Sequence, residues 1–259
     1  MRALINAIDQ VLIKTVGFVA ACESYAAILD TEPFFETSPG NPRAAVFLTT
    51  NITVKLIESD SDPGLAGLIF QCADRDAIKR RLQRVGLDNT DMPIDRSAAA
   101  HAFILLSPEK TRGLTIGITQ GATAIPPDPG TPISSQLALD HIVIATDQPE
   151  HIGFLLSAQL GLDLRMDLSN EQWNSRLLFF RCGDAIVEVY SAINKNDRKE
   201  SDHFFGLTWR VTDIAATHKR LQKCGFEASE IRKGRKPGTA VFTLKTGTEH
   251  VPTLFLGPT

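Results

Sequence analysis

The sequence lacks paired cysteines, an excess of positive charge and any long apolar run. Its four cysteines lie far apart and form no CxxC pair, so neither a zinc ribbon nor a disulfide framework is indicated. We expect reduced, mostly buried thiols in a cytoplasmic protein. The net charge of −3 provides no basic surface for a phosphate backbone, so nucleic acid is not an expected partner. Because no segment approaches the ~20 apolar residues of a membrane span, we expect no membrane partner either.

Composition and length indicate a folded chain with room for two domains. Hydrophobic residues make up 43% and charged residues 22% of the 259 residues, as in soluble globular proteins. The chain also repeats itself, because Gly67–Gly86 aligns without gaps with Gly206–Gly225. One constant offset gives the identical pairs Gly67/Gly206, Leu68/Leu207, Asp74/Asp213, Ala77/Ala216, Arg81/Arg220, Leu82/Leu221, Gln83/Gln222 and Gly86/Gly225. Such an offset is the signature of an internal duplication.

The beginnings of the two halves match as well. Ile8–Ile13 parallels Leu139–Ile144, and small changes of offset elsewhere place insertions in loops. A segment with four prolines and several small polar residues separates the halves and is typical of a linker. The sequence therefore predicts one domain over residues 1–122, a linker over 123–136 and a second domain over 137–259.

Each half is predicted to contain two copies of one βαβββ pattern, which we call a module. In the second half, apolar runs rich in branched residues predict strands, and Asp213 can cap a helix that Gly225 ends. Gly183 suits a tight hairpin turn between two strands. The predicted strands are 139–145, 164–168, 176–181, 185–190, 207–211, 228–231, 240–244 and 253–256, and the predicted helices are 149–160 and 214–224.

The second half resembles a known superfamily. The run LDHIVIATD from Leu139, the helix ending in LGLDL and the segment RLLFFRCGDAIVEVYS from Arg176 are similar to the vicinal oxygen chelate superfamily. That superfamily contains glyoxalase I, methylmalonyl-CoA epimerase, extradiol dioxygenases, and the fosfomycin and bleomycin resistance proteins. The resemblance implies an α+β fold of two tandem glyoxalase-like domains. In each domain, two modules would curl a mixed sheet into a cup that holds a ligand or a divalent metal.

The resemblance also implies metal ligands in the second half. The family's first-strand His matches His141, and its last-strand Glu matches Glu188. A divalent Zn, Fe, Mn or Ni ion would suit this pair. The following module carries Gly206 where a His often stands, and Thr253 or Leu254 where a Glu would stand. A catalytic metal usually needs about three protein ligands, so the predicted set is incomplete.

The first half offers no metal ligand at the equivalent positions. These positions hold Gln10, Lys55, Gly67, and Leu114 or Thr115. Lys55 would repel a cation if its side chain pointed into the cup. We therefore expect a first half without metal, which serves as a structural or oligomerisation copy.

Further residues of the second half are candidates for substrate binding. Arg176 precedes a strand and could attract a carboxylate or phosphate at the mouth of the cup. Its match with Arg43 in the first half favours a shared structural role instead. Strand alternation predicts that Thr208 and Arg210 face the cup while Trp209 packs under a helix. His203 and His250 are interpreted as surface residues.

Two functions remain open on the sequence. In the first, the chain is an enzyme, a lyase, isomerase or dioxygenase, in which His141 and Glu188 hold a metal that polarises a substrate oxygen. Glu188 could also act as a general base. Gly206 weakens the dioxygenase alternative. In the second, the chain is a non-catalytic binder of the bleomycin-resistance type, in which His141 is a hydrogen-bonded core residue and Glu188 faces solvent. A homodimer is possible in either case.

Overall fold

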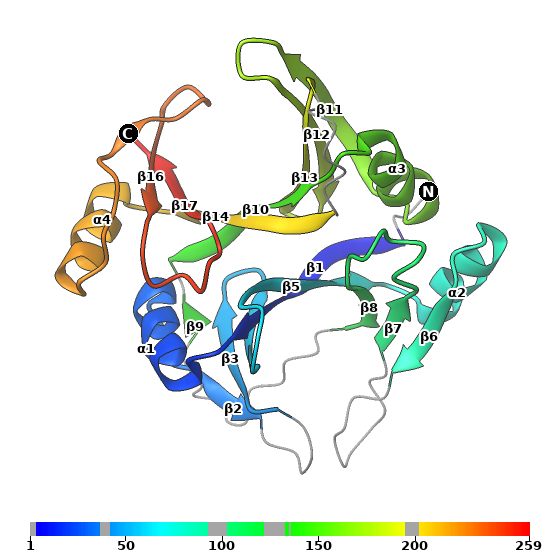
Figure 1. The fold of residues 1–259 in the computed structure, drawn as a ribbon, viewed down its shortest axis with the longest axis horizontal. Coiled ribbons are helices and arrows are strands. Elements are labelled where there is room, and N and C mark those ends of the chain that lie inside the picture. Colours follow the sequence, from blue (N-terminus) through cyan, green and yellow to red (C-terminus); the bar gives the residue numbers. More distant parts are fainter. Residues whose placement is uncertain (1–3, 37–41, 93–102, 122–132, 135, 195–201) are drawn as a thin grey trace. The chain divides into compact units, whose positions relative to one another are not determined.

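The computed structural model describes the chain except residues 1–3, 37–41, 93–102, 122–132, 135 and 195–201. Its strands form two mixed sheets, one for each half of the sequence (Figure 1). The first sheet has the order β2-β3-β4-β1-β5-β8-β7-β6, with β9 paired to β3, and the second has the order β11-β12-β13-β10-β14-β17-β16-β15. The predicted α+β fold of four βαβββ modules in tandem domains is confirmed.

The elements of the first half are β1 (Ile5–Thr15), α1 (Phe18–Leu29), β2 (Phe34–Glu36), β3 (Ala44–Thr49), β4 (Thr53–Glu58), β5 (Gly64–Cys72), α2 (Arg75–Arg84), β6 (Asn89–Met92), β7 (Phe103–Leu106), β8 (Ile116–Gln120) and β9 (Ile133–Ser134). Those of the second half are β10 (Leu137–Ala145), α3 (Pro149–Phe154), the π-helical segment η1 (Leu155–Gln159), β11 (Asp163–Asn170), β12 (Ser175–Cys182), β13 (Ala185–Ala192), β14 (His203–Val211), α4 (Ile214–Lys223), β15 (Arg232–Lys233), β16 (Thr239–Leu244) and β17 (Thr253–Pro258). Strand β9 lies in the predicted linker, most of which falls outside the described residues.

Helix caps and glycine turns in the sequence predicted the ends of several of these elements. The predicted helix 149–160 forms as α3 followed by η1, and it ends at Gly161, whose φ of 82° is left-handed. Asp213 caps α4, because its carboxylate accepts a hydrogen bond from the backbone N–H of Ala216 at 2.8 Å. Gly183, with φ of 66°, makes the turn between β12 and β13.

The strand predicted at 228–231 is wrong. The strand of this region is β15, and Ala228 forms only an isolated bridge with Leu244. The Ser229 hydroxyl accepts a hydrogen bond from the Thr243 backbone N–H at 3.0 Å, so a side chain takes the place of a ladder carbonyl there. Short-range competition of this kind is typical of serine.

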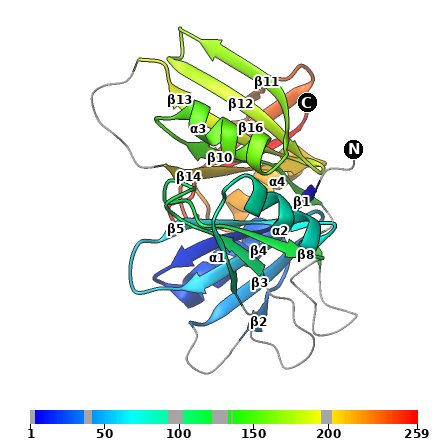
Figure 2. The same cartoon turned by 90° about the vertical axis from the view of Figure 1, so that its right-hand side faces the viewer.

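One face of each sheet is covered by helices. Helix α1 packs against β3 and β4, and α4 packs against β16 and β17 (Figure 1). Helix α3 packs against β13 (Figure 2). Large side chains buried beneath these helices include Phe47, Phe180, Trp209, Phe242 and Phe255. We call this side of each sheet its helix-covered face and the other side its open face.

The described chain divides into two compact units that do not coincide with the sequence halves. Unit 1 contains Met1–Asp9, Gly67–Thr123 and Ile142–Phe205, and unit 2 contains Gln10–Ala66, Ala124–His141 and Gly206–Thr259. Each unit thus combines most of one module from each half. The predicted domain boundaries stay a prediction.

In unit 1, an arginine of the first half binds the end of a helix of the second half. Arg81 on α2 donates hydrogen bonds to the carbonyl oxygens of Gln159 at 2.7 Å and Ala158 at 2.5 Å, at the end of η1. A cation at a helix C-terminus is favourable, because unpaired carbonyls and the helix dipole both attract it.

In unit 2, the equivalent arginine of the second half binds the end of a helix of the first half. Arg220 on α4 donates to the carbonyl oxygens of Ala27 and of Ile28, at the end of α1. Arg81 and Arg220 are an identical pair of the duplication. Each half therefore uses the same residue of its second module to hold the first helix of the other half.

Hairpin turns form a second pair of matching contacts. In unit 1, a Cβ on Gly183 would lie 2.9 Å from the carbonyl oxygen of Asn6, so this turn rests directly on the beginning of β1. In unit 2, the Asn51 side chain donates to the Leu139 carbonyl at 3.0 Å and accepts from the Leu139 N–H at 2.8 Å, at the beginning of β10. Each unit thus brings the hairpin turn of one half against the first strand of the other half.

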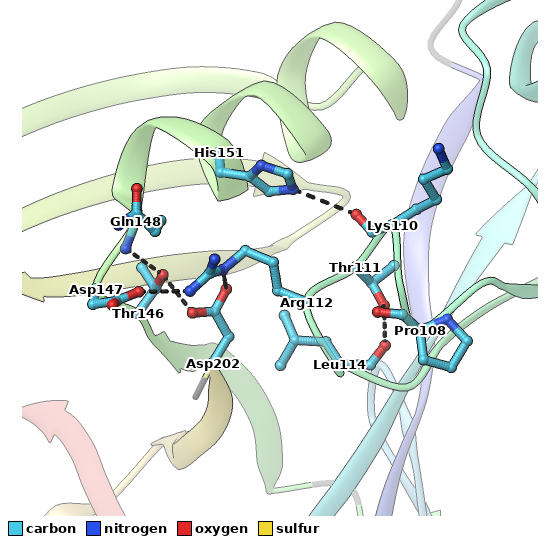
Figure 3. Close-up of polar contacts among 10 residues, drawn as sticks. All are labelled: Pro108, Lys110, Thr111, Arg112, Leu114, Thr146, Asp147, Gln148, His151 and Asp202. Atoms are coloured by element: carbon cyan, nitrogen blue, oxygen red, sulfur yellow. Dashed lines mark hydrogen bonds and ion pairs between the residues drawn. The ribbon is translucent and has the colours of Figure 1, made fainter. Parts of the chain in front are cut away.

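Unit 1 also contains a charged contact between the halves (Figure 3). The Arg112 guanidinium donates to Asp202 at 2.8 Å and to Asp147 at 2.6 Å, and Asp202 also accepts from the Thr146 hydroxyl at 2.8 Å. The Asp202 side chain is fully buried. In unit 2 the equivalent threonine, Thr15, donates to Glu249 at 2.6 Å. In both units the threonine hydroxyl thus donates to a carboxylate, but in unit 1 that carboxylate also binds an arginine.

Candidate functional site

Glu188 lies on the open face of the second sheet, within unit 1. Glu188 on β13 is paired with Phe179 on β12, and Tyr190 on β13 is paired with Leu177 on β12. Met166 and Leu168 on β11 continue the same face outward. The residues between them, Leu178, Phe180, Val187 and Val189, are buried on the helix-covered face. We call the set Met166, Leu168, Leu177, Phe179, Glu188 and Tyr190 the Glu188 face.

The Glu188 face is mostly apolar, and its outer part is exposed. Met166 and Leu168 are each 49% exposed and Tyr190 is 39% exposed, whereas Glu188 itself is only partly accessible. Adjacent exposed apolar side chains are typical of a binding surface. A carboxylate on such a face can accept a hydrogen bond or a proton from a bound molecule.

His141 lies in unit 2, with two charged neighbours. Its Nδ1 is 3.0 Å from the Asp140 carboxylate, and Arg210 donates to the other oxygen of Asp140 at 3.2 Å. Burial raises the pKa of Asp140, but the hydrogen bonds and charges of His141 and Arg210 outweigh it and lower that pKa overall. Arg210 therefore contacts an aspartate that the sequence interpretation had not considered. The available signal was Asp9, which occupies the position of Asp140 in the first half.

Strand β14 shows the predicted alternation. Trp209 is paired with Phe255, and both are buried. Thr208 and Arg210 lie on the other face, beside Leu254 and Leu256. Thr208 is itself buried. His203 and His250 are exposed, as predicted.

Gly206 leaves no room for the histidine that a metal site of this kind would require. A Cβ on Gly206 would lie 2.6 Å from the Pro252 carbonyl oxygen, which already accepts a hydrogen bond from the Leu207 N–H at 2.9 Å. Within the described ranges, no group of three or more His, Cys, Asp or Glu side chains could hold a metal ion. The donors therefore do not fit a centre with three protein ligands, and His141 and Glu188 as metal ligands stay a prediction.

Arg176 lies on the helix-covered face, opposite to the Glu188 face. It donates to the Asp167 carboxylate on β11 at 3.1 and 3.0 Å and to Glu150 in the first turn of α3. These contacts raise the pKa of Arg176 and lower that of Asp167. The matching Arg43 pairs with Glu58 and lies 4.8 Å above the ring of Phe18, the first residue of α1. The two arginines share a structural role, which joins a strand to the start of a helix.

In the first half, the position that matches Glu188 holds Lys55, which forms an ion pair. Lys55 lies beside Leu12 on the open face and donates to Glu36 at 2.8 Å, while Gln10 is buried beside Thr53. A cavity of about 490 Å³ lies elsewhere in this half, beside α1, and none of the predicted site residues lines it.

Comparison with known proteins identifies the second half. Residues 140–242 match the family model described as the glyoxalase/bleomycin resistance protein/dioxygenase superfamily. These residues belong to that superfamily. The predicted resemblance to the vicinal oxygen chelate proteins is thereby confirmed. No curated protein matches the chain in sequence.

Solved structures of this superfamily's fold match nearly the whole chain. A mutant of 4-hydroxymandelate synthase from Streptomyces coelicolor has a TM-score of 0.74 at 12% identity, covering 98% of this chain and 93% of its own. The Mn(II)-bound glyoxalase from Novosphingobium aromaticivorans has 0.71 at 13%, covering 99% and 83%. The 2,3-dioxygenase LapB from Pseudomonas sp. KL28 has 0.75 at 10%, covering 99% and 93%. At these identities the likeness shows a shared fold of two tandem glyoxalase-like domains.

The helices of the described ranges were also compared with the length of a membrane span. None of them combines the length and the apolar character that crossing a bilayer requires.

Proposed function

We propose that the chain is a small-molecule enzyme of the vicinal oxygen chelate type, whose second half binds an apolar, ring-containing substrate on the Glu188 face. The observation that carries this proposal is one carboxylate among exposed apolar side chains, paired with Phe179 and two residues from Tyr190. Phe179 and Tyr190 would contact the ring of the substrate. Glu188 would accept a proton from its hydroxyl group or from an activated carbon.

No step is assigned to a metal. The described donors fall short of three, and the position of the missing histidine is closed by Pro252. Metal analysis of protein purified without chelator tests the predicted pair directly. Stoichiometric metal that is lost in both His141→Ala and Glu188→Ala would support the pair, and absence of metal after loading with Zn²⁺, Mn²⁺, Ni²⁺ and Fe²⁺ would exclude it.

Binding of catechol and of 4-hydroxymandelate tests the proposed surface, because similar structures carry these compounds or their derivatives in their names. In ¹⁵N-labelled protein we expect chemical shift changes on β12 and β13, and at least a tenfold weaker affinity in Phe179→Ala. Glu171→Gln is the matched control for Glu188→Gln, because Glu171 is an exposed carboxylate outside this face. Shift changes confined to other elements would contradict the proposal.

Metal-free sequestration is a second candidate, favoured by the closed position at Gly206. It predicts binding on the same face without turnover, and equal affinity in the wild type and in Glu188→Gln. Product formed from a bound compound, and lost in Glu188→Gln, would exclude it. Homodimer formation and a cytoplasmic location stay predictions.

A further inference from the structure

The cavity of about 490 Å³ in the first half is lined by α1, β2 and the beginning of β3 (Figure 1). Its walls are mostly apolar and include the rings of Phe18 and Phe35, whose centroids are 6.4 Å apart. Val19 and Phe35 are 61% and 60% exposed, so part of this apolar wall is accessible from solvent. Cavities of about 300–1,000 Å³ with apolar and aromatic walls are typical of small-molecule sites.

Contacts outside the cavity hold its walls in place. The Arg43 guanidinium lies 4.8 Å above the Phe18 ring and donates to both carboxylate oxygens of Glu58, at 2.7 and 2.5 Å. At the other end of α1, Arg220 donates to the carbonyl oxygen of Ile28 at 3.3 Å. All of these residues belong to unit 2. A ligand would therefore enter a site that is already formed, which reduces the ordering cost of binding.

The charges beside the cavity favour a cation. Among the described residues that line it, Glu23, Glu32 and Arg43 are charged. The charge of Arg43 is balanced by its ion pair with Glu58, whereas Glu23 and Glu32 are exposed acids. The cavity thus combines aromatic faces with an excess of negative charge, and both features attract an organic cation.

The second half differs at the equivalent positions. It has Glu150 where the first half has Val19. Arg176, the counterpart of Arg43, donates to Glu150 and so joins its strand to the start of the helix. Val19 has no acceptor for such a bond. An apolar wall of the cavity therefore replaces, in the first half, an ion pair of the second half.

We propose that this cavity binds an organic cation with a flat apolar body, of the arylalkylamine class. Phe18 and Phe35 would contact the apolar body, and the carboxylates of Glu23 and Glu32 would attract the ammonium group. The site lies in a sequence half and a compact unit other than those of Glu188. It goes beyond the proposed function, and either proposal can fail without the other.

Three probes with one ring system and different charges test this proposal. At neutral pH tryptamine is a cation, tryptophol is neutral and indole-3-acetate is an anion. In the ¹⁵N-labelled full chain we expect tryptamine to change the chemical shifts of α1 and β2. Its affinity should exceed that of tryptophol by about threefold, because exposed ion pairs contribute modestly. Indole-3-acetate should bind more weakly than tryptophol.

Variants separate the ring contact, the charge and the space. Phe35→Ala should weaken tryptamine binding by about fivefold. Phe154→Ala is the matched control, because Phe154 is 58% exposed and belongs to unit 1. Combined Glu23→Gln and Glu32→Gln should make the affinities for tryptamine and tryptophol equal. Ala26→Leu adds a side chain to the cavity wall and should weaken the binding of tryptamine and tryptophol alike.

Several outcomes would overturn the proposal. These are equal affinities of the wild type for the three probes, and shift changes confined to elements outside α1, β2 and β3. Shift changes of α1 and β2 on dilution of the protein alone would show that a second copy occupies this surface, and would also overturn it. If tryptamine binds as expected while catechol leaves β12 and β13 unchanged, the proposed function fails and this site stands.

Discussion

At the scale of single residues, Gly206 shows how backbone packing limits chemistry. The family resemblance implies a histidine at this position, but Pro252 occupies the space that any side chain would need. A metal ligand at this position would require β14 and the Pro252 segment to separate. One substitution would therefore not be enough to create a metal ligand there.

Gly206→Ala tests this limit. We expect the free energy of unfolding to fall by about 1–3 kcal/mol, because the added methyl overlaps a backbone carbonyl that cannot rotate away. Urea denaturation measures the change. Gly17→Ala is the control, because a Cβ there has no atom within 4 Å. Equal stability of the wild type and Gly206→Ala would show that Pro252 can move.

The buried thiols predict a loss of stability at alkaline pH. Burial raises the pKa of the Cys182 thiol to about 12 from its ordinary value of 9.0. Between these values the unfolded chain has released a proton that the folded chain keeps, so stability falls as pH rises, by up to ~1.4 kcal/mol per pH unit for this group. Unfolding measured from pH 8 to pH 10 should show a smaller slope in Cys182→Ala. An unchanged slope would contradict the burial effect.

Residue identities could be predicted better than residue partners. His141 and Glu188 were selected because they match a family pattern, and Thr208 and Trp209 were placed on opposite faces by alternation alone. The Asp140–Arg210 contact could not be predicted, because it joins strands that are far apart in sequence. The exclusion of a side chain at Gly206 likewise depends on Pro252. The proximity of these two residues follows from how the strands pair, which neither segment predicts by itself.

At the scale of elements, Arg176 and Arg43 tie strands to the starts of helices. Arg176 reaches Asp167 on β11 and Glu150 on α3 from β12. Arg176→Ala should lower the free energy of unfolding by about 1 kcal/mol, because partly exposed ion pairs contribute modestly. Differential scanning calorimetry measures this effect.

The same variant separates a structural from a substrate role. Because Arg176 lies on the helix-covered face, Arg176→Ala should leave the affinity for catechol unchanged. A large loss of affinity with unchanged stability would favour the substrate role that the sequence also allowed.

The order of elements could be predicted well, and their edges less well. Apolar runs and glycine turns gave β10, β12, β13, α4 and β16 within a few residues. Strand β15 was misplaced because Ser229 satisfies backbone groups with its own hydroxyl. The π-helical turn in η1 carries no sequence signal that periodicity can detect.

At the scale of the whole molecule, the sequence halves and the compact units differ. The duplication revealed two copies, but it could not reveal that each compact unit combines modules of both halves. Arg81 and Arg220 were visible in the sequence as an identical pair of the duplication. Their contacts with helix ends of the other half require tertiary structure to be seen.

Arg112→Ala should strongly destabilise unit 1. The buried Asp202 carboxylate accepts hydrogen bonds from Arg112 and Thr146, and removal of the guanidinium leaves it the Thr146 hydroxyl. Loss of one partner of a buried pair costs about 3 kcal/mol. Arg165→Ala is the control, because Arg165 pairs with an exposed aspartate. Hydrogen exchange should show the loss on β10 and α3 first, and a change no larger than that of the control would contradict this role.

The contrast between Arg112 and Glu249 has an evolutionary consequence. In a dimer of identical chains, every mutation at a symmetric interface occurs twice. A new charge therefore changes both copies of a contact in the same way. A fused duplicate is free of that constraint. One copy of the contact could become a cation between two acids, while the other became an acid on a threonine. Duplication within one chain thus allows each half to change independently of the other, and the two halves do differ: the second carries His141 and Glu188 where the first carries Gln10 and Lys55.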